Sequence, residues 1–183
     1  MMKAFLTTAL LLLAGMTAHG RSQDTGGAPM HLYLVRHGDA VDERQDPQRP
    51  LSDRGNVEVE KVARHLASLS IKPDRIFHSP KLRAAQSAHI LEQHLHPARG
   101  SEEAEGLLPN DSPKAWKKRL KEMDGTVMLV GHLPSLARMA SLLLSDDAEK
   151  IQLAVAMGGV VCLSRDMKGS WALEWMIAPE QIK

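Results

Sequence analysis

The segment HLYLVRHG, residues 31–38, decides the fold. Its first residues are mostly apolar, as expected of a strand buried in a sheet, and its last three are Arg36, His37 and Gly38. A strand that ends in this way presents an arginine and a histidine at the edge where parallel α/β sheets bind their ligands. This strand end is therefore the first candidate for a functional site.

Strand-like and helix-like segments alternate along the rest of the chain. Besides His31–Arg36, the predicted strands are Arg75–His78, Thr126–Val130, Val160–Ser164 and Trp171–Ile177, the last two forming a hairpin around Lys168-Gly169. The predicted helices run from about Asp53 to Ser70 behind a Ser52 cap, from Ser79-Pro80 to about Leu95, from Ser112-Pro113, and from near Pro134. The acidic run Glu102–Glu105 is interpreted as a solvated loop. This alternation predicts one α/β domain with a layered, mostly parallel sheet.

The first twenty residues differ from the rest. The apolar run Ala4–Met16 follows Lys3 and is short for a membrane span, and small residues precede Arg21. We predict a signal peptide over residues 1–20 and hence export to the periplasm, with no stable membrane insertion after cleavage. An apolar membrane anchor is the alternative interpretation.

The mature chain is then expected to consist of a flexible, Gly-rich lead-in over residues 21–29 and a domain over residues 30–183. Its formal charge is zero, because the predicted signal peptide holds a single charged residue, Lys3. Neutral charge and 3% aromatic residues argue against a nucleic-acid partner. The lone Cys162 lies in an apolar strand and is expected to be a buried small hydrophobe.

Basic residues follow three of the predicted strands. Arg36 and His37 end the first, Arg83 follows the second, and His132 follows the strand that ends at Val130. Because the carboxyl ends of parallel strands share one edge, two arginines and two histidines are expected to face one pocket.

This set of side chains suits a phosphoryl group. Guanidinium groups match phosphate oxygens with paired hydrogen bonds and remain charged, so Arg36 and Arg83 would bind the anion. A histidine attacks phosphorus as neutral imidazole, with one ring nitrogen bare and the other donating to a fixed acceptor. Gly38 is expected to let the anion approach the backbone, and the turn at Ser79-Pro80 to direct backbone N–H groups toward it.

Four segments in this order resemble a known family. They are Leu34–Ala40, Arg49–Gly55, Ser79–Ala88 and Val130–Pro134. Over roughly residues 30–178 the chain resembles the histidine phosphatase (phosphoglycerate mutase-like) superfamily, and most nearly its short SixA-type phosphohistidine phosphatases.

The resemblance implies a three-layer α/β/α sandwich around a mostly parallel sheet. It implies that His37 is the phosphorylated nucleophile and that Arg36, Arg83 and His132 complete the phosphate pocket. Neither a metal nor an organic cofactor is expected. The substrate would be a phosphorylated small molecule or a phosphohistidine protein.

One departure from the family leaves the proton donor open. Many larger members have an aspartate directly after the second histidine, whereas Leu133 follows His132 here. The candidate donors are Asp39, beside the nucleophile, and Glu105, in a connection where related enzymes place an acidic residue.

Other functions stay open from the sequence. An export signal also fits a sugar-phosphate phosphatase that acts on the heptose of the lipopolysaccharide core. A catalytically silent module that holds a phosphorylated partner would use the same pocket, and a mutase is a further alternative.

Overall fold

The computed structural model describes residues 30–183. The predicted signal peptide and lead-in, residues 1–29, lie outside the described residues. Within residues 30–183, no helix is both long enough and apolar enough to cross a membrane.

Six strands form one sheet in the order β3-β2-β4-β1-β5-β6. Their bounds are Met30–Arg36 (β1), Arg75–His78 (β2), Ser101–Glu103 (β3), Gly125–Gly131 (β4), Val160–Arg165 (β5) and Trp171–Ile177 (β6). The pairs β3·β2, β2·β4 and β4·β1 are parallel, while β5 is antiparallel to both of its neighbours. The mostly parallel sheet predicted from the sequence is thereby confirmed.

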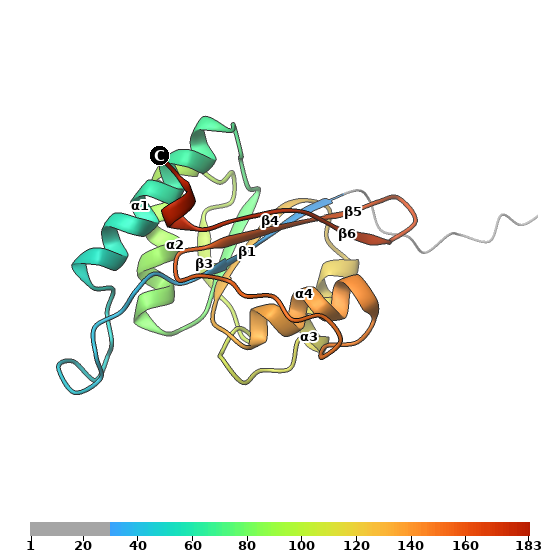
Figure 1. Cartoon of the computed structure of the whole chain (residues 1–183). Helices are drawn as coiled ribbons and strands as arrows, with labels where there is room; N and C mark the ends of the chain where they lie inside the picture. The colour runs from blue at the N-terminus through green and yellow to red at the C-terminus, as the bar shows by residue number, and fades with distance from the viewer. Residues whose placement is uncertain (1–29) are drawn as a thin grey trace, which may run out of the picture.

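Helices cover both faces of this sheet, which makes three layers (Figure 1). The helices α1 (Asp53–Ser68) and α2 (Leu82–Leu95) lie on one face, and α3 (Lys114–Lys121) and α4 (Ser135–Ser145) lie on the other. A short 3₁₀ helix, Pro179–Gln181, packs near α1 at the end of the chain.

Strand residues supply the two cores alternately. In β1, Leu32 and Leu34 pack toward α3 and α4, whereas Tyr33 and Val35 pack toward α1 and α2. Successive side chains of a strand point to opposite faces, so a strand covered on both sides must be apolar throughout. Cys162 lies in the core toward α1 and α2 and is buried, as expected.

The register of β1 against β4 positions the site. Pairing is unbroken from Met30 opposite Gly125 to Arg36 opposite Gly131. The next residue on each strand is a histidine, and the N–H of His37 donates to the carbonyl of Gly131 over 3.0 Å. Because the strands are parallel and in register, His37 and His132 leave the sheet side by side.

Several predicted boundaries were wrong. The helix α2 begins at Leu82 with Lys81 as its N-cap, not at Ser79-Pro80, and Lys81 makes no side-chain cap hydrogen bond. Pro113 and Pro134 were predicted to be the first residues inside their helices. They are instead the N-cap residues of α3 and α4, which begin at Lys114 and Ser135. The acidic run is also not wholly a loop, because Ser101–Glu103 pairs with β2 as an edge strand.

The expected role of Gly38 was wrong too. A Cβ atom on Gly38 would lie 2.7 Å from Cγ2 of Val59 and 3.0 Å from the carbonyl oxygen of Gly55, both in α1. A Cβ atom on Gly55 would lie 2.0 Å from the carbonyl oxygen of Asp39. The two glycines therefore allow α1 to pack against the backbone that follows His37, and the space beside Gly38 is filled by protein.

Candidate active site

Three neighbouring strands deliver the central groups of the site. Past the ends of β1, β4 and β2 stand His37, His132 and Ser79, and the N–H of Ser79 donates to the carbonyl of Val130 over 3.0 Å. The imidazole rings of His37 and His132 lie 4.8 Å apart between centroids. The two histidines are therefore brought together as the sequence predicted.

The hydrogen bonds of His37 define which ring nitrogen carries its proton. Nδ1 lies 2.6 Å from the carbonyl oxygen of Gly38, and a carbonyl can only accept, so Nδ1 is the donor. Nε2 accepts from Nε of Arg83 over 3.1 Å. His37 is thus held as the tautomer with a bare, basic Nε2, which is the form required of a nucleophile.

Burial keeps His37 neutral. Desolvation is the main cause that lowers its pKa from 6.5 to about 4, and the charges of Arg83, Arg36 and Arg49 lower it further. The hydrogen bond to Gly38 acts in the opposite direction. At neutral pH the imidazole is therefore uncharged, because a buried cation among three guanidinium groups is unfavourable.

His132 is buried beside it in a similar state. Its Nε2 lies 2.8 Å from Oγ of Ser79, while Nδ1 is buried and has no hydrogen-bond partner among the residues that the structure describes. Burial, followed by the proximity of His37 and Arg83, lowers its pKa from 6.5 to about 3. The contact that His132 makes in the site is therefore the one between Nε2 and Ser79.

The two predicted arginines are held by different partners. Nη1 of Arg36 donates to the carbonyl of Val155 over 2.8 Å, and its Nε atom is buried without a hydrogen-bond partner in the described part of the chain. Arg83 is 8% exposed, lies in the first turn of α2 and donates to His37. Burial lowers the pKa of both guanidinium groups.

Neither arginine has a carboxylate partner within 4.0 Å among residues 30–183. Cations that are buried, as Arg83 is, or partly buried, as Arg36 is, are normally paired, because an unpaired charge in a low-dielectric site is costly. The arrangement suits a bound anion, which would supply the missing negative charge.

The two predicted proton donors differ in their surroundings. Oδ2 of Asp39 accepts from the hydroxyl of Ser52 over 2.6 Å, and Oγ of Ser52 in turn accepts from the N–H of Gly55 over 3.0 Å. Asp39 therefore holds the first turn of α1 against the loop that follows His37.

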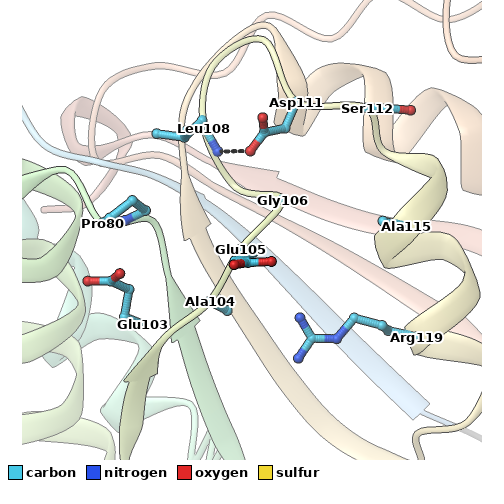
Figure 2. A pocket seen from close by; sticks show the side chains of 10 residues that line it. All are labelled: Pro80, Glu103, Ala104, Glu105, Gly106, Leu108, Asp111, Ser112, Ala115 and Arg119. Atoms are coloured by element: carbon cyan, nitrogen blue, oxygen red, sulfur yellow. Dashed lines mark hydrogen bonds between the residues drawn. The ribbon is translucent and has the colours of Figure 1, made fainter.

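Glu105 is exposed and lines a cavity of about 570 Å³ between the loop after β3 and α3 (Figure 2). Pro80, on the other side of that cavity, directly follows Ser79, the partner of His132. None of the predicted phosphate-pocket residues His37, Arg36, Arg83 and His132 lines this cavity, so the link between Glu105 and the histidine pair runs only through Pro80 and its neighbour Ser79.

The sequence prediction missed several contributing residues. Ser79 was expected to direct backbone N–H groups as a helix cap, but its hydroxyl contacts His132. Val155 was not predicted, and only its main chain takes part, so no side-chain type could have revealed it. The charge of Arg49 lowers the pKa of both His37 and Arg83. The feature of the sequence that could have indicated this role is the position of Arg49 at the start of the segment Arg49–Gly55.

Comparison with known proteins agrees with this geometry. The model of the histidine phosphatase superfamily (branch 1) matches residues 32–107, which include three of the four predicted site residues. An uncharacterized protein of Picosynechococcus sp. (strain PCC 7002) is 37% identical over 121 residues, which cover 61% of this chain and 71% of that protein. The chain belongs to the histidine phosphatase superfamily.

Phosphohistidine phosphatase SixA of Escherichia coli is 26% identical over 163 residues, covering 84% of this chain and 97% of that protein. Among solved structures, SixA in complex with tungstate superposes with a TM-score of 0.76 at 24% identity, covering 84% of this chain and all of that one. The predicted phosphoglycerate mutase-like fold is confirmed.

The buried histidines predict a particular pH dependence of stability. Their pKa values lie below 6.5 in the folded state, so between about pH 4 and pH 6.5 the unfolded chain binds more protons. Their contribution is therefore complete above pH 6.5 and is lost as the pH falls through this window. Urea unfolding at pH 7 and pH 5 should show a smaller loss for the double variant His37→Asn/His132→Asn than for the wild type.

The control for this comparison is His89→Asn, because the side chain of His89 is exposed on α2. It should reproduce the wild-type loss of stability between the two pH values. A double variant that also lost as much stability as the wild type would show that the two site histidines are not buried in neutral form.

Proposed function

We propose that this chain is a phosphatase in which His37 receives the phosphoryl group and then passes it to water. The observation that carries the proposal is the state of His37, whose Nδ1 donates to Gly38 and whose Nε2 is a bare acceptor in contact with Arg83. A neutral imidazole fixed in this tautomer is a phosphorus nucleophile that needs no further base.

Two displacements at phosphorus complete the reaction. In the first, the hydrogen bond from Arg83 to Nε2 of His37 breaks, the freed lone pair of Nε2 forms a bond to phosphorus while the bond from phosphorus to the leaving group breaks, and the leaving atom takes up a proton. In the second, a water oxygen forms a bond to phosphorus, the N–P bond breaks, and the proton of the water is given up. The products are inorganic phosphate and regenerated, neutral His37.

The cations around His37 would stabilise both displacements. Arg83 is buried and Arg36 is partly buried, and neither has a carboxylate partner among residues 30–183, so their charge is available to the equatorial oxygens of the transferring group. Arg83 contacts Nε2 itself, which places its guanidinium group beside the point where phosphorus would be attacked.

A phosphohistidine protein is the substrate class that we favour. The imidazole of a phosphohistidine leaves readily once protonated, whereas an alkoxide requires a general acid. Asp39 is engaged with Ser52, and Glu105 is exposed to solvent, so neither carboxylate is buried at the nucleophile. The similarity to SixA, named as a phosphohistidine phosphatase, supports the same choice.

A phosphorylated sugar is the alternative substrate, and the cavity beside Pro80 favours it. This cavity of about 570 Å³ has room for a leaving group, and Glu105 on its wall could protonate a sugar oxygen. Phosphatase action on the heptose of lipopolysaccharide would belong to this class.

Covalent labelling tests the proposed reaction. Brief incubation with a labelled phosphodonor and a quench without acid should label His37, because attack by imidazole forms a phosphoramidate. The label should be lost in acid and survive in base, and mass spectrometry should locate it on His37. The variant His37→Ala should take up no label.

The same experiment separates an enzyme from a silent binding module. Phosphate release without label in the wild type would contradict the histidine intermediate. A protein that binds phosphate but neither takes up label nor releases phosphate would be a phosphate-binding module.

The variant Glu105→Gln tests the proton donor and the substrate class together. If Glu105 protonates the leaving group, turnover of an alkyl phosphate should fall by about a hundredfold, while that of an activated aryl phosphate changes little. Glu103→Gln is the matched control, since Glu103 lines the same cavity and should leave both rates unchanged. Equal effects of Glu105→Gln on both substrates would exclude Glu105 as the donor.

We also propose that the chain is exported, on the evidence of its first twenty residues. Expressed in a Gram-negative host, it should give a periplasmic product whose N-terminal sequence begins near Arg21. Deletion of residues 2–20 should keep the folded protein in the cytoplasm. An uncleaved product in the membrane fraction would instead support the anchor interpretation.

A further inference from the structure

Arg49 lies in a loop whose two ends are fixed to the active site. Ala40 and Leu51 form an antiparallel bridge, and the N–H of Val41 donates to the carbonyl of Pro50 over 2.9 Å. The N–H of Leu51 donates to Oε1 of Gln86, one turn of α2 beyond Arg83, over 2.7 Å. The loop therefore begins just after His37 and returns to the helix that carries Arg83.

The backbone at Arg49 is unusual for an arginine. Its φ is 51°, in the left-handed region that glycine, asparagine and aspartate occupy most readily. The side chain is only partly buried, and its hydrogen bond is from Nε to the carbonyl of Val41 over 3.3 Å. A strained residue that gains so little from packing is often maintained for function.

The charge of Arg49 is uncompensated, unlike that of its neighbour in the same loop. Arg44 pairs with Asp42 over 3.0 Å, whereas Arg49 has no carboxylate partner within 4.0 Å in the described part of the chain. Its charge also lowers the pKa of both His37 and Arg83, so its field reaches the site. Arg36 and Arg83 are likewise without carboxylates, which makes three such guanidinium groups around one neutral nucleophile.

We propose that Arg49 is a third phosphate-binding residue, which contacts a non-reacting oxygen of the phosphoryl group and selects its dianionic form. This inference rests on the proposed function of the same site. Three cations beside two neutral histidines favour a doubly charged phosphomonoester or phosphoramidate over a singly charged phosphodiester, because only the former offsets most of the positive charge.

The variant Arg49→Gly distinguishes a role of Arg49 in phosphate binding from a role in stability, because glycine accepts a φ of 51° without strain. We expect the dissociation constant for inorganic phosphate, measured by calorimetry, to rise at least about tenfold with loss of a charge-assisted contact. The melting temperature of the free protein should be unchanged or higher. Arg49→Lys should recover part of the affinity, because it restores charge without the planar fork.

Arg44→Ala is the matched control, as it removes an arginine from the same loop whose side chain is 91% exposed. It should bind phosphate like the wild type. Phosphate affinity within twofold of wild type in Arg49→Gly would overturn the inference, and so would a parallel fall in affinity and melting temperature, which would indicate a structural role.

Failure of the proposed function would give a different combination of phosphate-binding and labelling results from failure of the inference about Arg49. A wild type that binds phosphate more tightly than Arg49→Gly but takes up no label on His37 would keep Arg49 as an anion-binding residue and remove the catalytic role of His37. A wild type that does not bind phosphate at all would overturn both.

Discussion

The site depends on one hydrogen bond, from the N–H of His37 to the carbonyl of Gly131, which fixes the backbone of the nucleophile beside the end of β4. It continues the unbroken register of the two central strands, β1 and β4, past their ends. A slip by one residue would turn every core side chain of β1 to the wrong face, so both cores hold this register. The relative position of the two histidines is therefore set by packing along the whole length of the strands.

Electrostatics and burial reinforce each other in this arrangement. His37 and His132 stay neutral because they are buried, and the guanidinium groups beside them make protonation still less favourable. The same guanidinium groups have no acidic partners among residues 30–183, so this part of the site carries positive charge while its nucleophile carries none. This separation keeps the nucleophile reactive within a field that attracts anions.

The sequence predicts the parts of this structure that depend on periodicity and on side-chain type. The strand ending at Arg36 and the helix capped by Ser52 both follow from local signals, and the cap is present as predicted. The edge strand Ser101–Glu103 was missed because it is polar and exposed at its end, with little burial to impose a pattern. The role of Gly38 could not be predicted, because it depends on a tertiary contact: Val59 of α1 fills the space beside Gly38.

The place of β1 in the sheet also governs how the chain can fold during synthesis. It is the first strand of the domain to be made, yet its neighbours β4 and β5 begin only at Gly125 and Val160. Until β4 has emerged, the only pairing open to the strands of residues 30–183 is that of β2 with β3. The nascent chain must close long loops before its central strands pair, which slows folding. The first strand of the domain is therefore among the last to be fully paired, and the central part of the sheet is completed only when most of the chain has been made.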